Sequence, residues 1–257
     1  MLRILFEDKN LLAVSKPAGF LVHKTAIAKT VTENLVETLQ QQLNRSVFPI
    51  HRIDRPTSGI VWFAFNRETA NTMRQLWVNQ EVKKYYVALL RGFCPLAGHI
   101  TKALCSEYDK KEKEAITYYQ LIQHIELPIA QKKFPTTRYS LVLCMPITGR
   151  THQLRKHFAH IRHYIIGDKK HGDTQQNKHA QINFNLNNML LHAFQTQFTH
   201  PVSGKAIIVN DSLPKYWRQI LTEETVDQKL RLSLSQLSVA SLLPVSQTKE
   251  CTHYVYS

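Results

Sequence analysis

Residues 51–65 read HRIDRPTSGIVWFAF and join a charged loop to an apolar segment. The last six residues form an unbroken apolar run, which is typical of a strand buried on both faces. The residues before it place one acid, Asp54, between Arg52 and Arg55, and a Pro and a Gly shape the backbone just behind it. The stretch therefore predicts a carboxylate held in a loop at the edge of a rigid core.

The segment before this stretch predicts a hairpin, a loop and a helix. Residues 4–15 read as two strands around an acidic turn, and the tetrapeptide KPAG at 16–19 ends the second strand as a loop. Apolar residues then recur at helical spacing over 35–43, with Thr32 as the expected N-cap.

The segment after it mixes strands and helices without a regular alternation. The expected elements are a helix over 66–77 that begins at Asn66, a strand over 82–90, an exposed connection over 106–115, a strand over 136–146, a helix over 150–161 and a hairpin turn at 200–205. This order favours an α+β fold with a mixed, largely antiparallel sheet and flanking helices over a doubly wound fold.

The charge of the chain indicates a polyanionic partner. There are 33 Lys and Arg against 19 Asp and Glu, which leaves a net charge of +14. A field of this sign attracts nucleic acid, so RNA or DNA is the first partner to consider. An unspecialised basic enzyme remains the alternative.

Cysteine usage and the N-terminus indicate where the protein works. Its four cysteines are scattered without CxxC spacing, so neither a zinc site nor a disulfide framework is expected. Glu7 and Asp8 interrupt the N-terminal apolar residues where a secretory signal would continue, and no apolar run reaches the length of a membrane span. We therefore expect a cytoplasmic, monomeric protein without membrane contact.

The chemistry available to Asp54 is that of an ionised carboxylate. Neighbouring cations favour the charged form, which suits a nucleophile, a base or an electrostatic stabiliser and does not suit a general acid. The alternative is a structural one, an Asx-type cap on Thr57 or Ser58. Because no second carboxylate stands out as a partner to activate water, the site argues against glycoside hydrolysis.

Four motifs occur in an order that resembles the RluA-type pseudouridine synthases. They are KPAG at 16–19, HRIDRPTSG at 51–59, the tyrosine pair at 85–86, and TGRTHQLRKH at 148–157 followed by IIGD at 165–168. Two further stretches, FPTTRYSLV at 134–142 and GDKKHGD at 167–173, look like the bacterial tRNA pseudouridine synthase C group, which modifies uridine 65 of tRNA.

The resemblance implies a fold, a reaction and a set of residue roles. It implies a catalytic domain over 1–221 with a central RNA-binding cleft, and a C-terminal extension of unknown role over 222–257. Asp54 would be the catalytic aspartate, which attacks or deprotonates the ribose as the N1 to C1′ bond of a flipped uridine breaks. Tyr86, rather than Tyr85, would stack on the uracil, and Arg155 would pair with Asp54.

The resemblance also implies RNA contacts. Arg52 would fill the space that the flipped nucleotide leaves, and the same motifs supply Lys16, Arg55, Arg150 and His152 as further RNA-binding residues. The reaction requires no metal or organic cofactor. The expected substrate is tRNA.

Three alternatives stay open beside this interpretation. The first is the same isomerisation on ribosomal RNA, and the second is a non-catalytic RNA-binding protein, in which an anion beside the phosphates would serve no purpose. The third is a metal-dependent nuclease that uses the histidines of 152–171. Surrounding Arg and Lys would repel a cation there, and no Cys joins the histidines.

Overall fold

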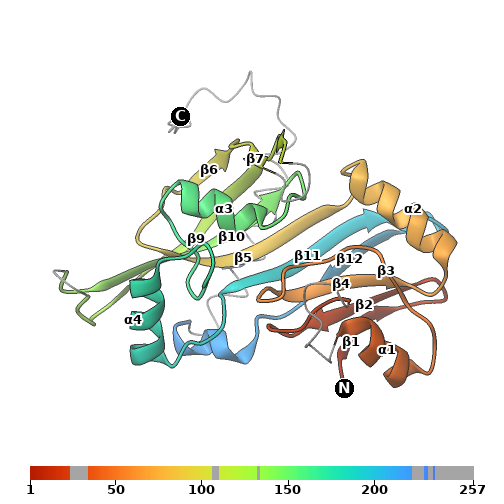
Figure 1. The fold of residues 1–257 in the computed structure, drawn as a ribbon, viewed down its shortest axis with the longest axis horizontal. Helices are drawn as coiled ribbons and strands as arrows, with labels where there is room; N and C mark the ends of the chain where they lie inside the picture. The colour runs from red at the N-terminus through yellow and green to blue at the C-terminus, as the bar shows by residue number, and fades with distance from the viewer. Residues whose placement is uncertain (24–33, 106–109, 132–133, 222–228, 231–233, 235–257) are drawn as a thin grey trace. The chain divides into compact units, whose positions relative to one another are not determined.

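The computed structural model describes residues 1–23, 34–105, 110–131, 134–221, 229–230 and 234 (Figure 1). The chain divides into two compact units. Unit 1 comprises residues 1–86 and 191–214, and unit 2 comprises residues 87–190 together with those from 215 onward. Each unit combines β-strands with α-helices, which confirms the α+β class.

Unit 1 is built on a mixed sheet. Its elements are β1 (Arg3–Glu7), β2 (Leu11–Lys16), α1 (Leu35–Leu43), β3 (Phe48–Pro49), β4 (Ser58–Ala64), α2 (Arg67–Val78), β11 (Leu191–Thr199) and β12 (Ala206–Asn210). Strands β1, β2, β4 and β11 lie in this order, with β12 beside β11 and β3 beside β4. Only β4 and β11 among these described pairs run parallel, so the largely antiparallel sheet is confirmed.

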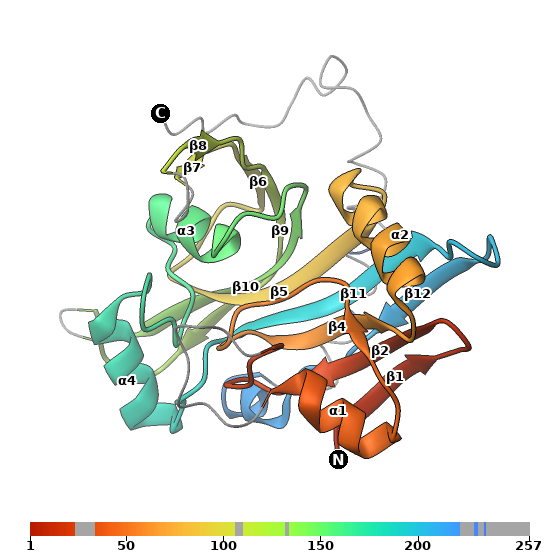
Figure 2. The same cartoon turned by 45° about the vertical axis from the view of Figure 1, so that its right-hand side comes forward.

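Each face of this sheet packs against its own helix. Successive residues of a strand point to opposite faces, so neighbouring residues of β2 contact different helices. On one face, Leu12 of β2 packs in a cluster with Leu39 of α1. On the other face, Leu11 of β2 packs in a cluster with Met73 of α2. Figure 2 shows α1 below and α2 above these strands. The strands of unit 1 are therefore held between two helices.

Asparagine caps begin both helices of unit 1. The Asn34 side chain accepts from the N–H of Glu37 at the start of α1, at 3.1 Å, and the Asn66 side chain accepts from the N–H of Thr69 at the start of α2, at 2.7 Å. Asn66 confirms the expected start of α2. Thr32 lies outside the described residues, and the cap expected of it was wrong, because Asn34 is the N-cap of α1 and its side chain accepts from the N–H of Glu37.

Unit 2 contains the remaining elements. They are β5 (Lys83–Arg91), which begins in unit 1, and β6 (Ala97–Ile100), β7 (Leu104–Cys105), β8 (Glu112–Lys113), β9 (Thr117–Leu127), β10 (Thr137–Pro146), α3 (Gln153–His160), α4 (Thr174–Phe184) and the 3-10 helix η1 (Lys215–Gln219). Strands β5, β10, β9 and β6 lie in this order, and β7 pairs with β8 separately. Part of the predicted exposed connection, residues 106–109, lies outside the described residues.

Helices α3 and α4 cover opposite faces of the long β9–β10 pair. Phe158 of α3 contacts the ring of Tyr119 on β9, and Phe184 of α4 contacts the ring of Tyr139 on β10. Tyr119 pairs with Cys144 of β10, which is five positions beyond Tyr139 and so faces the other side of the sheet. Figure 1 accordingly shows α3 above and α4 below these strands.

The predicted boundary near residue 221 stays a prediction, because most of 222–257 lies outside the described residues. Of the few residues described there, Leu230 is fully buried. The ammonium of Lys229 donates to the side chain of Gln123 on β9 at 3.2 Å.

Candidate active site

Asp54 lies in a tight turn that leads into β4. The N–H of Thr57 donates to the backbone carbonyl of Asp54 at 3.0 Å, which closes the turn. Ile53, which precedes Asp54, is buried in the apolar cluster beneath α1 that also contains Leu12 and Leu39. Strand β4 begins at Ser58, just after the turn. Asp54 itself is half-buried. The turn therefore presents a carboxylate from a backbone that is fixed on both sides, as the sequence predicts.

The KPAG loop is clamped to this turn. The N–H of Gly19 donates to the carbonyl of Arg55 at 2.8 Å, and Nε of Arg55 donates back to the carbonyl of Gly19 at 2.9 Å. Nζ of Lys16 donates to the carbonyls of Pro17, Phe20 and Arg55 at 2.9 to 3.0 Å. Two motifs that are 35 residues apart in sequence thus form one structure around Asp54.

Lys16 is buried beside this carboxylate, with 1% of its surface exposed. Burial lowers the pKa of its ammonium to about 7, the negative charge of Asp54 opposes that change, and Arg55 adds to it. The three carbonyls give the ammonium a structural task between the two loops. Its predicted contact with RNA stays a prediction.

Tyr86 shares the environment of Asp54. Its ring packs against the buried cluster beneath α1, which also contains Ile53. Burial raises the pKa of the Tyr86 phenol, and the carboxylate of Asp54 raises it further. Tyr85, the neighbour on the opposite face of the strand, is 1% exposed. Strand alternation alone could not choose between the two tyrosines, and the structure brings Tyr86 within the electrostatic reach of Asp54.

Arg52 and Arg55 flank Asp54 and are both exposed. The hydrogen bond to the carbonyl of Gly19 orients the Arg55 side chain. The pKa of His23 is lowered mainly by burial and further by the positive charge of Arg52. Both guanidinium groups are therefore accessible to a ligand at the surface of unit 1.

A buried polar network supports β4 directly behind the Asp54 turn. His192 of β11 lies between Ser58, whose hydroxyl is 2.9 Å from Nδ1, and the backbone carbonyl of Asp211, which is 3.2 Å from Nε2. Because that carbonyl can only accept, Nε2 carries the proton and Nδ1 accepts from Ser58. Asp211 in turn forms an ion pair with Arg3.

This network is structural despite its serine, histidine and aspartate. Ser58 is 1% exposed and His192 is fully buried, so no substrate reaches them. The backbones of β4 and β11 also approach closely there, since a Cβ on Gly59 would lie 2.3 Å from the carbonyl oxygen of Ala193. No local sequence pattern predicts this network, because Ser58, His192 and Asp211 are far apart in the chain.

In unit 2 the TGRTHQLRKH and IIGD motifs meet through a buried ion pair. Nε and Nη2 of Arg155 donate to the two carboxylate oxygens of Asp168 at 2.8 and 2.7 Å, and the side chains are 5% and 1% exposed. Burial alone would raise the pKa of Asp168, but the bonds from Arg155 and from backbone N–H groups of Lys170 and His171 hold that pKa below its usual value.

Arg150 and His152 lie just before α3. Nε of Arg150 donates to the carbonyl of Glu114 at 3.0 Å, and the side chain is exposed. His152 has a left-handed backbone with a φ of 56°, and its Nδ1 is 2.9 Å from Nε2 of His171. Unit 2 therefore holds Arg150, His152 and Arg155, and unit 1 holds the other five predicted site residues, Lys16, Arg52, Asp54, Arg55 and Tyr86. Their roles stay predictions, as does the pairing of Asp54 with Arg155.

A family model for RNA pseudouridylate synthases matches residues 10–160, which is more than half of the 257 residues. The chain belongs to this family. The match covers the KPAG loop, the Asp54 turn, both tyrosines and α3, so every predicted site residue lies within the family region.

Relatives of this family member are similar over most of its length. The "tRNA pseudouridine synthase C" of Vibrio vulnificus (strain CMCP6) is 41% identical over 230 residues, which cover 86% of this chain and 94% of the relative. The protein of the same name from Haemophilus ducreyi (strain 35000HP / ATCC 700724) is 40% identical over 231 residues, which cover 86% and 95%.

Solved structures of pseudouridylate synthases share the fold. "Human RNA Pseudouridylate Synthase Domain Containing 1" aligns with a TM-score of 0.69 and 23% identity over 90% of this chain and 94% of that chain. "Human RNA Pseudouridylate Synthase Domain Containing 4" aligns with a TM-score of 0.63 and 24% identity over 89% and 93%.

The described residues show two further properties of this synthase. None of their helices has the length and apolarity of a membrane span. Their His, Cys, Asp and Glu side chains include no group of three that could hold a metal ion. His157, for example, is fully buried and lies 3.0 Å from both the hydroxyl of Thr117 and the carbonyl of Lys102.

Proposed function

We propose that this chain isomerises uridine 65 of tRNA to pseudouridine, with Asp54 as the catalytic residue. One observation carries the proposal, which is that the KPAG loop is hydrogen-bonded to the Asp54 turn through Lys16 and Arg55, while the ring of Tyr86 packs in the same cluster as Ile53, all within unit 1. The names of the relatives, together with the FPTTRYSLV and GDKKHGD stretches, support tRNA as the substrate.

The reaction we propose conserves all atoms. Asp54 either attacks C1′ of the ribose or removes a proton from C2′ while the N1 to C1′ bond breaks. The freed uracil turns within the site, and its C5 forms the new bond to C1′. C5 then loses its proton and N1 gains one, so no oxidant, metal or organic cofactor enters the balance.

In this scheme the neighbours of Asp54 bind the uracil, hold the KPAG loop in place and fill the gap in the RNA. Because its pKa is raised, Tyr86 stays a neutral phenol, and we assign its ring to stacking on the uracil, an interaction worth about 1 to 3 kcal/mol per base. Lys16 holds the KPAG loop against the Asp54 turn through its three carbonyl bonds. We assign Arg52 to the gap left by the flipped nucleotide, whose extrusion costs a few kcal/mol.

The remaining predicted residues complete the proposal. Arg155 is assigned as the cation that pairs with Asp54, and its bidentate bond to Asp168 fixes the plane of its guanidinium. Arg55, Arg150 and His152 are assigned to RNA contact. The central cleft of the family belongs to this proposal as well, and so do a cytoplasmic location and a monomeric state.

The proposal is tested in cells that lack the gene for this chain. Pseudouridines are mapped by chemical labelling in total RNA after complementation with the wild type, with Asp54→Asn or with Glu68→Gln, a control that removes an acid from the first turn of α2. We expect uridine 65 of tRNA to be modified with the wild type and the control, and unmodified with Asp54→Asn. Loss of a ribosomal pseudouridine instead would show that the substrate assignment is wrong, and unchanged RNA would refute the enzyme assignment.

A further inference from the structure

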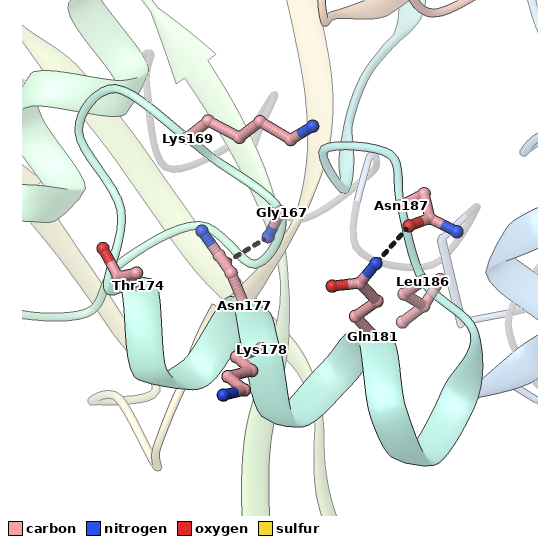
Figure 3. Close-up of a pocket in the computed structure, with 8 residues that line it drawn as sticks. All are labelled: Gly167, Lys169, Thr174, Asn177, Lys178, Gln181, Leu186 and Asn187. Carbon is pink, nitrogen blue, oxygen red and sulfur yellow. Dashed lines mark hydrogen bonds between the residues drawn. The ribbon is translucent and has the colours of Figure 1, made fainter.

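A cavity of about 360 Å³ lies in unit 2, between α4 and the loops on either side of it (Figure 3). Six of its eight lining residues have polar side chains, and the other two are Gly167 and Leu186. The lining residues are Gly167, Lys169, Thr174, Asn177, Lys178, Gln181, Leu186 and Asn187. We call this cavity the α4 pocket.

The sequence of α4 turns a polar face to the pocket. Thr174, Asn177, Lys178 and Gln181 are spaced by three or four residues, which places them on one side of a helix. The carboxylate of Asp173 caps that helix by accepting from the N–H groups of Gln175 and Gln176 at 2.9 and 3.1 Å.

The floor of the pocket is rigid. The Asn177 side chain accepts from the N–H of Gly167 at 2.7 Å and donates to the carbonyl of Asp168 at 2.8 Å. Gly167 has a φ of 81°, and a Cβ there would lie 2.1 Å from the carbonyl oxygen of Asn188. Any other residue would therefore push the two loops apart.

The pocket carries positive charge that its surroundings do not neutralise. Lys169 and Lys178 are exposed, and neither ammonium has a hydrogen-bond or ion-pair partner among the residues that the structure describes. The two acids nearby in the chain are engaged elsewhere, since Asp168 pairs with Arg155, and Asp173 pairs with Arg91 at 2.7 Å.

The arrangement of the two lysines fits an extended anion. Figure 3 shows the Lys169 side chain on the loop above α4 and the Lys178 side chain on the lower side of the helix, with the side chains of Asn177 and Gln181 between them in this view. A phosphodiester backbone offers successive phosphates to such a pair and places ribose hydroxyls, which donate and accept, against the amides.

We propose that the α4 pocket binds the phosphodiester backbone of the substrate RNA. This inference rests on the proposed function for its substrate. It gives the GDKKHGD stretch, which supplies Gly167 and Lys169, a physical role in binding. Because the lysines neutralise phosphates and take no part in bond making, the pocket contributes to affinity and not to the isomerisation step.

The test compares pairs of substitutions that change charge and little else. The Lys169→Met and Lys178→Met pair removes both charges, whereas the Lys169→Arg and Lys178→Arg pair keeps them. A third pair, Lys9→Met and Lys205→Met, removes two exposed charges from unit 1. The dissociation constant of each variant for transcribed tRNA is measured between 50 and 200 mM salt, with KM and kcat for pseudouridine formation.

We expect the Lys→Met pair in the pocket to raise Kd about tenfold. The slope of log Kd against the logarithm of the salt concentration should become less steep by about one to two, because two phosphate contacts that release counterions are lost. KM should rise while kcat stays the same. The Arg pair should bind like the wild type, and the unit 1 pair should change Kd less than the pocket pair.

Three results would overturn the inference. The first is that the pocket Lys→Met pair keeps the affinity and salt dependence of the wild type, and the second is that the unit 1 pair loses as much tRNA affinity as the pocket pair. The third is that the pocket pair loses as much affinity for a polyglutamate peptide as for tRNA, which would show a site for acidic ligands in general. Unchanged melting temperatures establish that the variants fold. Binding is read separately from chemistry, so a wild type that binds tRNA but forms no pseudouridine refutes the proposed function and leaves this test intact.

Discussion

Two aspartates of this chain, Asp54 in unit 1 and Asp168 in unit 2, both belong to motifs that the sequence analysis singles out and both lie near cations, yet they are held differently. The oxygens of Asp168 accept from both ends of the Arg155 fork and from two backbone N–H groups, and 1% of its side chain is exposed. Asp54 is half-buried, and its charge acts on a lysine and a tyrosine beside it.

We infer from this difference that Asp168 has a structural role, whereas Asp54 has the reactive role that the proposed function assigns to it. A carboxylate whose lone pairs are filled by fixed donors stabilises its own loop and has little capacity left for a substrate. A half-buried carboxylate beside a phenol and an ammonium keeps its charge near the surface, where a sugar can meet it. We therefore expect loss of Asp168 to lower stability, and loss of Asp54 to lower activity with little effect on stability.

The largest effect on stability is expected from Asp168→Ala. It removes the carboxylate that accepts both bonds from the buried Arg155 guanidinium, which costs about 3 to 5 kcal/mol of unfolding free energy. Urea unfolding measures this cost. The control, Glu126→Gln, weakens the ion pair between Arg138 and Glu126, whose side chains are 50% and 43% exposed, and should cost far less unfolding free energy than Asp168→Ala because water screens that pair. Equal losses in both variants would remove the distinction between the two kinds of carboxylate.

A smaller effect is expected from Gly59→Ala, which tests how tightly the strand behind Asp54 is held. Gly59 has a φ of 112°, and an added Cβ would lie 2.3 Å from the carbonyl oxygen of Ala193. Strain and overpacking should together cost about 2 to 4 kcal/mol of unfolding free energy.

Gly204→Ala is the matched control. Its φ is 67°, and among the described residues no atom lies within 4 Å of its Cβ position. Backbone strain alone should then cost about 1 to 2 kcal/mol. If Gly59→Ala cost no more than this control, the close approach of β4 and β11 would not constrain the Asp54 turn.

A separate effect is a pH dependence of stability that arises at His51, three residues before Asp54. Burial, followed by the charge of Lys84, lowers the pKa of His51 to about 3, and its Nε2 accepts from the N–H of Trp62 at 3.1 Å. The folded state therefore binds the proton less tightly than the unfolded state does. Its contribution to stability is complete above pH 6.5, the ordinary pKa, and is lost as the pH falls toward 3.

The His51→Gln variant isolates this contribution. Its unfolding free energy, measured in urea from pH 7 to pH 4, should fall less steeply than that of the wild type. Parallel curves would show that His51 is protonated as easily in the folded protein as in the unfolded chain.

Sequence patterns predicted the parts of the fold in which apolar periodicity is strong. The hairpin of β1 and β2, strand β4 and helix α2 follow directly from alternating, continuous or helical apolar spacing. The Asp54 turn was predicted for a related reason, because Pro56 and Gly59 mark the change from loop to strand.

Helix α4 could not be predicted in this way. Its sequence, TQQNKHAQINF, is polar on nearly every side, and only Ala180 is buried in it. What fixes the helix is its cap at Asp173 and the tertiary contact of Phe184 with Tyr139, neither of which has a periodic signal. The α4 pocket was missed with it.

The contact between the TGRTHQLRKH and IIGD motifs could not be predicted from the sequence either. The IIGD segment was recognised without a role for its aspartate, and only the structure brings Asp168 to Arg155. The buried bond between Ser58 and His192 joins residues 134 positions apart, a separation that no local pattern encodes.

Release of tritium from tRNA labelled at C5 of uridine tests the central claim most directly, since C5 loses its hydrogen only when it joins C1′. We predict release by the wild type, and none by Asp54→Asn even though this variant binds the same tRNA within several-fold and unfolds at a similar urea concentration. Release by Asp54→Asn at the rate of the wild type would contradict the account.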